Sequence, residues 1–298
     1  MSGEKPNLTA FASMPPYYID QPNLQTTPLI FASPHSGRNY PPDFVAKSQL
    51  DPVSLRRSED AFVDNLFAAA PSKGASLIRA TFPRAFIDAN REPFELDQNM
   101  FSDRLPDYVN IKSGRVAAGL GTIPRIVSGG QEIYSEKLTF SEAAARIEAY
   151  YKPYHTALTQ LIDNVRKQFD YCVLVDCHSM PSIGSQLAPD AGHGRADFVI
   201  GDCFGTTCAP YISDAIENTI AGFGYIVARN KPFAGGFTTR SYGKPQDGIH
   251  AVQIEINRAL YMDERQIEKS TGFNHVAGQM TDVISTLTDL TTQDLAAE

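Results

Sequence analysis

The chain has 298 residues, of which 42% are hydrophobic, so it is long enough for one large domain or two with a sizeable core. Asp and Glu number 34 against 26 for Lys and Arg, giving a formal net charge of -8, whereas general nucleic-acid binders usually carry a basic surface. No run approaches the roughly 18 apolar residues that a membrane span needs. These features favour a globular protein that binds neither nucleic acid nor a membrane.

The N-terminal segment and the cysteines bear on organisation and location. Residues 1–20 are polar and contain prolines, without the apolar core of a signal peptide. We therefore predict a loose N-terminal arm over residues 1–24 and a single domain over residues 25–298. No Cys-x-x-Cys spacing occurs, so neither a zinc ribbon nor a disulfide framework is indicated and the cytoplasm is the simplest compartment. The cysteines are Cys172, Cys177, Cys203 and Cys208.

The first elements are predicted from apolar patterns and the breakers beside them. Residues 29–33 form an apolar run that ends at Pro34, which predicts a buried strand. Residues 58–70 have apolar side chains at helical spacing behind a serine N-cap, which predicts a helix. Two further strands are predicted over residues 75–82 and 85–88.

The middle of the chain contains an irregular stretch followed by a long helix. Residues 97–130 are rich in Gly, Pro and polar residues without a clear period, which predicts a long binding loop or lid. Thr139 and Glu142 form a capping box before an amphipathic pattern that continues to about residue 169. Pro153 predicts a kink or a break in that helix.

The second half of the chain alternates strand-like and helix-like segments. Strands are predicted over residues 171–176, 197–201, 225–228 and 251–256, and helices over residues 207–221 and 263–290. This alternation predicts an α/β fold in which helices cover a mixed or mostly parallel sheet.

Two histidines follow apolar, strand-like runs, His35 in Ser-Pro-His-Ser-Gly and His178 in Val-Asp-Cys-His-Ser-Met. Ligand sites in open α/β sheets lie beyond the carboxyl ends of the strands, so we expect the two imidazoles to converge. Imidazole is a common zinc ligand, and a catalytic zinc usually has three protein ligands and a position for water. Glu59 and Asp60 are the nearest candidates for the third ligand. Alternatively, the histidines are structural and these carboxylates only stabilise the positive end of a helix.

Glu255 is the strongest candidate for a general acid–base residue. In Val-Gln-Ile-Glu-Ile from Val252, apolar residues alternate with Gln253 and Glu255, so these two side chains share one face of a strand. Such a face is either solvated or lines a cavity. Beside a metal ion, the carboxylate of Glu255 would take a proton from water and pass it to the departing nitrogen.

Four residues are candidates for binding an anionic substrate. Asn90 and Arg91 come directly after a strand-like run, and an arginine binds a carboxylate through two parallel hydrogen bonds. Arg84 and Arg240 are candidates to extend the same pocket. Each arginine has the alternative of an ordinary surface ion pair.

Taken together, these segments resemble the N-formylglutamate amidohydrolase (N-formylglutamate deformylase) family from about Leu29 to Met262. Six motifs in order carry the resemblance: SPHSGRNYP from Ser33, SEDAFVD from Ser58, FPRAFIDANR from Phe82, VDCHSM from Val175, GGFTTRSYG from Gly235 and HAVQIEINR from His250. The resemblance implies a three-layer α/β sandwich with a mixed, mostly parallel sheet, similar to that of the zinc carboxypeptidases.

The resemblance also implies the roles of the site residues. One zinc ion is expected between His35, Asp60 and His178, with Asp60 chosen over Glu59 because the family pattern carries the aspartate. The compact His-x-x-Glu spacing of carboxypeptidases is absent, so the acidic ligand must come from the Ser58-Glu-Asp segment. The catalytic residues implied are Glu255 and Arg91, and the substrate-binding residues are Asn90, Arg91, Arg84 and Arg240.

The implied reaction is zinc-dependent hydrolysis of N-formyl-L-glutamate to L-glutamate and formate, as the final step of a histidine-degradation route. One alternative is a zinc hydrolase for another N-acyl amino acid or small peptide, because fold and metal say little about the acyl group. Another is a non-catalytic sensor of an acidic metabolite. A nucleophile at Cys177 is the weakest alternative, because this thiol would point to the opposite strand face from His178.

Overall fold

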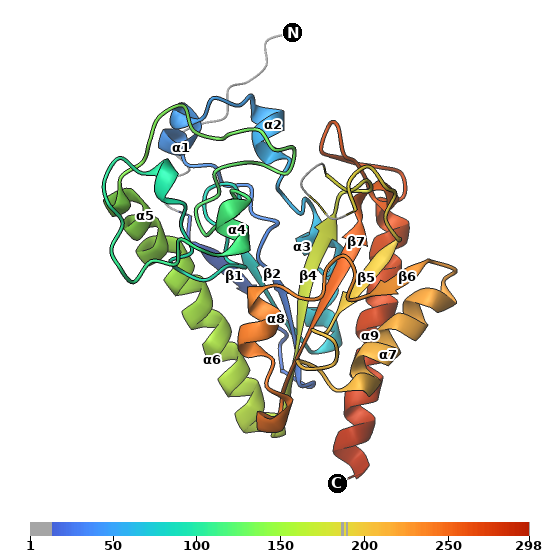
Figure 1. Ribbon diagram of the computed structural model, residues 1–298. Coiled ribbons are helices and arrows are strands. Elements are labelled where there is room, and N and C mark those ends of the chain that lie inside the picture. Colours follow the sequence, from blue (N-terminus) through green and yellow to red (C-terminus); the bar gives the residue numbers. More distant parts are fainter. Residues whose placement is uncertain (1–13, 186–187, 189, 298) are drawn as a thin grey trace.

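A computed structural model describes residues 14–185, 188 and 190–297 of the chain. In this part, a seven-stranded mixed sheet lies at the centre, with helices on both faces (Figure 1). The strand order is β1-β3-β2-β4-β7-β5-β6. The strands are β1 (Tyr17–Asp20), β2 (Leu29–Ser33), β3 (Ser76–Ala80), β4 (Cys172–Met180), β5 (Phe198–Gly201), β6 (Val227–Arg229) and β7 (Ile249–Asn257).

The four central strands, β3, β2, β4 and β7, pair in parallel. β1 and β5 pair antiparallel with β3 and β7, while β6 pairs in parallel with β5. All residues of β2 and β4 are buried, as expected for central strands covered on both faces. The predicted α/β class and its mixed, mostly parallel sheet are confirmed.

Two hydrophobic clusters hold the helices against the two faces of the sheet. On one face, α6 (Lys152–Phe169) and α8 (Phe237–Tyr242) pack beside β2 and β4. On the other face, α3 (Val63–Leu66), α7 (Pro210–Gly222) and α9 (Phe273–Ala297) pack together (Figure 1). The two clusters make the layers of the predicted sandwich.

The remaining elements are short. They are the helices α1 (Pro42–Lys47), α2 (Pro52–Arg56), α4 (Gly114–Ala117) and α5 (Phe140–Arg146), the 3₁₀ turns Pro71–Lys73, Gln98–Met100, Pro245–Asp247 and Arg258–Leu260, and the hairpin β8 (Met262–Asp263) with β9 (Glu268–Lys269). No helix of the described residues is long and apolar enough to cross a membrane.

The predicted long helix is present, with a local change in its winding. The capping box of Thr139 and Glu142 begins α5, and a π-helical turn over Ile147–Tyr151 joins it to α6. Pro153 is the second residue after this π-helical turn, and the helical backbone continues through it. The predicted disturbance thus falls just before the proline, as a change of winding and not as a break.

Three predictions about local structure are wrong. Residues 58–70 do not form one helix, because Phe62 has a left-handed φ of 65° and only Val63–Leu66 is helical. Residues 85–88 are not a strand, because Phe86 N–H bonds back to the carbonyl of Pro83 in a turn. The last helix begins at Phe273 and not at residue 263, because the β8–β9 hairpin precedes it.

Part of the predicted N-terminal arm is ordered. Tyr17–Asp20 forms β1, which pairs antiparallel with β3, and Asp20 accepts a hydrogen bond from Arg79 at 2.7 Å. β-branched and aromatic side chains favour such an edge strand. The loose-arm prediction is therefore wrong for these residues, while residues 1–13 lie outside the described part.

Candidate metal centre and active site

The strand order brings His35 and His178 to the same edge of the sheet. β2 and β4 are parallel neighbours with Ala32 opposite Asp176, so His35 leaves β2 close to where His178 lies near the end of β4. The acidic segment is tied to this point by two hydrogen bonds. Asp60 N–H donates to the carbonyl of His35 at 3.0 Å, and Ser36 Oγ donates to the carbonyl of Asp60 at 3.0 Å.

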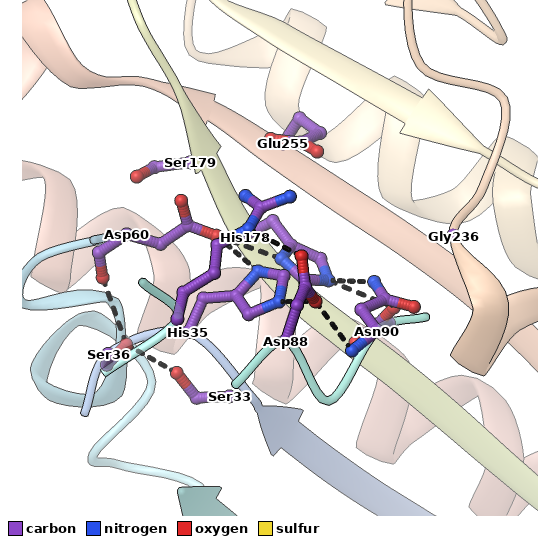
Figure 2. Close-up of polar contacts among 12 residues, drawn as sticks. Ser33, His35, Ser36, Asp60, Asp88, Asn90, His178, Ser179, Gly236 and Glu255 are labelled. Atoms are coloured by element: carbon purple, nitrogen blue, oxygen red, sulfur yellow. Dashed lines mark hydrogen bonds and ion pairs between the residues drawn. The ribbon is translucent and has the colours of Figure 1, made fainter. Parts of the chain in front are cut away.

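His35, Asp60 and His178 form a buried cluster, with 1%, 1% and 2% of their surfaces exposed. Oδ2 of Asp60 lies 3.3 Å from Nδ1 of His35 and 2.9 Å from Nδ1 of His178. One ligand atom from each of the three residues lies within 4.8 Å of the others. Figure 2 shows the three side chains meeting at one point.

The other ring nitrogen of each histidine faces a second carboxylate. Nε2 of His35 lies 2.8 Å from Asp88 Oδ1, and Nε2 of His178 lies 3.0 Å from both Asp176 Oδ2 and Asn90 Nδ2. Because Nδ1 of each ring faces Asp60, a cation bound at Nδ1 would leave the ring proton on Nε2, facing these carboxylates. Sequence reasoning assigned no role to Asp88 or Asp176, although Asp176 precedes His178 by two positions on the same strand face.

Electrostatics also favour a cation at this point. Burial would raise the pKa of Asp60, but its hydrogen bonds to His178 and His35 hold that pKa well below the usual value. Burial would lower the pKa of His178, but Asp176 and Asp60 raise it well above the usual value. The carboxylates that favour a proton on His178 would equally favour a divalent metal ion in place of that proton, and two imidazoles with one carboxylate form a donor set that fits such an ion.

The structure separates the two acidic candidates for the third ligand. Asp60 faces the histidines, whereas Glu59 accepts two hydrogen bonds from Arg56, at 2.9 and 3.0 Å, and one from Tyr40 at 2.6 Å. Glu59 therefore stabilises the turn before α3 and does not reach the cluster.

Glu255 lies on β7 directly opposite His178 of β4. Its side chain is only 8% exposed, and Oε1 accepts a hydrogen bond from Gln253 Nε2 at 2.9 Å. The two side chains share one strand face, as the alternation predicts, and this face is buried rather than solvated. Burial raises the pKa of Glu255 to about 7, while nearby His178 opposes the shift. A carboxyl group of this acidity suits general acid–base chemistry near neutral pH.

Asn90 and Arg91 lie beside the cluster, but most of their polar atoms bind other parts of the protein. Asn90 Nδ2 donates to Asp176 Oδ2 at 3.2 Å, and its Oδ1 accepts from Thr238 N–H at 2.7 Å. Arg91 donates through Nε to the carbonyl of Leu120 at 2.8 Å and through Nη1 to that of Asn90 at 2.7 Å. Nη2 of Arg91 makes no hydrogen bond with the described residues but forms an ion pair with Asp88 Oδ2 at 3.6 Å.

Arg84 and Arg240 keep more donors free. Arg84 uses Nε to bind Asp88 Oδ2 at 2.9 Å, and Arg240 uses Nη1 to bind the carbonyl of Gly235 at 2.9 Å. Sequence reasoning missed a third arginine, Arg115 on α4, whose side chain makes no hydrogen bond or ion pair with the described residues. Burial and the neighbouring guanidinium of Arg240 lower the pKa of Arg115. Of these three arginines, Arg84 alone forms an ion pair with a described residue, Asp88, while the charge of Glu95 also acts on Arg115.

The other histidines lie outside the cluster. His155 on α6 lies 2.8 Å from both the carbonyl of Ala89 and the hydroxyl of Tyr242. His250 is at the opposite end of β7 from Glu255, and its Nδ1 accepts from Ala209 N–H at 3.2 Å. His193 bonds to the carbonyl of Ala191, and His275 is exposed.

Cys177 faces away from the cluster. The thiol is fully buried among the side chains on the opposite face of the sheet, and Sγ contacts the carbonyl of Val175 at 3.4 Å. Burial raises its pKa well above the usual value. A protonated thiol without access to the site argues against cysteine nucleophile catalysis.

Comparison with known proteins identifies the family. The family model for N-formylglutamate amidohydrolase matches residues 27–262. The chain belongs to this family. A protein of Pseudomonas putida named N-formylglutamate deformylase is 30% identical over 243 residues, which cover 80% of this chain and 83% of that protein.

Solved structures agree with this membership. The crystal structure of N-formylglutamate amidohydrolase from Ralstonia eutropha JMP134 has a TM-score of 0.87 and 34% identity, covering 94% of this chain and all of that one (100%). A gene product of Agrobacterium tumefaciens shares the fold at 20% identity, with a TM-score of 0.63 and coverage of 94% and 97%. The sequence resemblance to the N-formylglutamate amidohydrolases is confirmed, and the further likeness to zinc carboxypeptidases stays a prediction.

Proposed function

We propose that this amidohydrolase converts N-formyl-L-glutamate and water to L-glutamate and formate, as the final step of a histidine-degradation route. One zinc ion per chain would be held by Nδ1 of His35, Nδ1 of His178 and Oδ2 of Asp60. The observation that carries the proposal is the convergence of these three donors beside one buried carboxylic acid, Glu255. The names of the relatives supply the substrate.

When bound, the zinc ion would act as a Lewis acid on the formyl oxygen and increase the acidity of the attacking water. Glu255 would accept the proton of that water and deliver it to the amide nitrogen as the C–N bond breaks. Asp88 and Asp176 would keep the two histidines in the tautomer that presents Nδ1. Formation of formate and an amine then requires no further reactant.

Three guanidinium groups would bind the two carboxylates of the substrate. Arg84, Arg240 and Arg115 have donors to spare, and a dianionic substrate would neutralise the positive charge that they concentrate near Asp88. Binding at these groups would fix the formyl amide against the metal and Glu255. Such a local group of arginine side chains would let a chain with an acidic net charge select an acidic substrate.

Asn90 and Arg91 remain part of the proposed binding site. Most of their polar atoms bind other protein groups and so hold the site in shape. Arg91 offers Nη2, and burial lowers its pKa to about 9, which still leaves a cation at neutral pH. Asn90 links Asp176 to the N-terminus of α8, which carries Arg240. We propose that the pair orients the anion pocket and adds one guanidinium edge to it.

We also propose that residues 25–298 act as one domain and that the protein works in the cytoplasm. One sheet runs through strands from both halves of the chain, and the four cysteines are free thiols, which suits a reducing compartment.

The experiment that tests the function is hydrolysis of a panel of N-acylated amino acids by the purified protein, followed for every substrate by the increase in free amino groups and for the formyl substrates also by formate release. The panel contains N-formyl-L-glutamate, N-formyl-L-leucine, N-acetyl-L-glutamate and a glutamyl dipeptide. We expect the highest kcat/KM for N-formyl-L-glutamate. A preference for another acyl group would assign the site to a different amide, and tight binding of N-formyl-L-glutamate without turnover would favour a sensor.

A further inference from the structure

Arg258 binds Oδ1 of Asp60, the carboxylate oxygen that does not face the two histidines. It follows β7 directly, and its side chain is buried, with 7% of the residue surface exposed. Each of its three nitrogens makes one hydrogen bond. Nη2 donates to Asp60 Oδ1 at 2.9 Å, Nη1 to the carbonyl of Arg57 at 3.1 Å and Nε to Ser179 Oγ at 3.2 Å. The planar guanidinium is thereby held in one orientation.

The two oxygens of Asp60 have different partners in this arrangement. Oδ2 faces both histidine Nδ1 atoms (Figure 2). Oδ1 is bound by Arg258. A carboxylate that chelates one ion with both oxygens has to turn Oδ1 toward that ion. Turning it would break a charge-assisted hydrogen bond in a buried site, which is costly.

We infer that Arg258 is a positioning residue that makes Asp60 a one-oxygen ligand and so keeps a coordination position open for water and substrate. The inference rests on the proposed metal centre at His35, Asp60 and His178. A carboxylate bound through both oxygens would fill the position that catalytic metal sites leave to water. Arg258 does not touch the reacting atoms in this account.

The substitution Arg258→Lys distinguishes the effect of the positive charge from the effect of the planar guanidinium geometry. A lysine at 258 keeps a positive charge but has no planar fork to bind Asp60, Ser179 and the Arg57 carbonyl at once. A methionine removes both the charge and the hydrogen bonds while keeping similar bulk. If geometry decides the binding mode of Asp60, both Arg258→Lys and Arg258→Met should release Oδ1.

The test is the visible spectrum of the cobalt-substituted full-length protein, because four-coordinate Co²⁺ absorbs much more strongly than five- or six-coordinate Co²⁺. We expect intense bands for the unaltered protein and weaker bands for Arg258→Met and Arg258→Lys. We also expect about 10- to 100-fold weaker zinc binding in the methionine variant, measured by competition with a chromophoric chelator.

The matched control is Arg146→Lys. Arg146 is also buried and donates from Nη1 to the carbonyl of Phe86 and the hydroxyl of Tyr134, without contacting the cluster. The substitution Arg146→Lys should lower the thermal unfolding temperature and leave the cobalt spectrum unchanged. If Arg258→Met does not fold, the lysine variant carries the test.

The results separate this inference from the proposed function. Cobalt bands and zinc affinity equal to those of the unaltered protein in both Arg258 variants would overturn the inference, as would full recovery of both by lysine alone. The reaction would remain supported if formate were still released. Failure of the unaltered protein to bind cobalt or zinc would overturn the proposed function and, with it, the role of Arg258.

Discussion

The substitution Glu255→Gln tests the acid–base role of the carboxylate opposite His178. The amide has nearly the same size, and its carbonyl oxygen can still accept the hydrogen bond from Gln253. The side chain is buried and is not one of the three proposed metal ligands, so fold and metal content should be unchanged. The amide cannot accept a proton, so we expect kcat to fall about 10²- to 10⁴-fold. This loss corresponds to roughly 3 to 5 kcal/mol in the activation barrier.

The assay for this variant is continuous detection of formate at several concentrations of N-formyl-L-glutamate, with zinc content and thermal unfolding measured on the same samples. Glu264→Gln is the matched control, because Glu264 is a partly buried carboxylate that accepts from Ser182 N–H and makes no contact with the cluster. It should keep normal kcat. Near-normal kcat in Glu255→Gln with full zinc content would refute the assignment of Glu255 as the base.

Three further substitutions test other parts of the account. Arg115→Ala should lower kcat/KM for N-formyl-L-glutamate by about 10- to 100-fold, the worth of one charged hydrogen bond, with little effect on N-formyl-L-leucine. The exposed Arg104→Ala is its control, and equal losses on both substrates would contradict an anion pocket. Asp176→Asn should weaken zinc binding about 10- to 100-fold in chelator competition, and unchanged affinity would show that this carboxylate does not orient its histidine. Burial lowers the pKa of His155 from 6.5 to about 4, so the unfolded state binds more protons below pH 6.5 and stability falls as the pH drops. Glu255 titrates in the same range with the opposite sign, so the variants are compared with the unaltered protein at each pH. Between pH 7.5 and 5, the unfolding free energy of the unaltered protein in urea should fall by about 2 kcal/mol relative to that of His155→Gln, while the exposed His275→Gln follows the unaltered protein.

The parts of the fold that follow from local pattern are predictable from the sequence. The apolar run of β2 between two prolines is correct at both ends, and the capping box begins the long helix where predicted. Both histidines come from such well-marked strands, which is why their convergence can be expected. The alternation around Glu255 likewise identifies the side chains that share its face.

The remaining features depend on contacts between distant segments. The helix expected over residues 58–70 is interrupted because the chain turns at Phe62 after Asp60 binds the backbone of His35. The pairing of Arg258 with Asp60 joins residues 198 positions apart, and no local pattern indicates it. Arg115 was missed because it lies in an irregular stretch, where spacing carries no information about direction.

A pattern can nevertheless hint at the supporting carboxylates. Asp176 lies two residues before His178, so strand geometry places both on one face, and Asp88 lies four residues after Arg84 in the same motif. Spacing does not predict which ring nitrogen each carboxylate faces, because that depends on the orientation of the ring in the folded protein.

The most direct measurement is formate release from N-formyl-L-glutamate by one protein sample before chelation, after chelation and after zinc is restored. We expect activity to disappear on removal of the metal and to return in proportion to added zinc, reaching a plateau at one equivalent per chain. Full activity in a sample shown to be free of metal, or a plateau that requires a different stoichiometry, would contradict the central claim that His35, Asp60 and His178 hold a single catalytic ion.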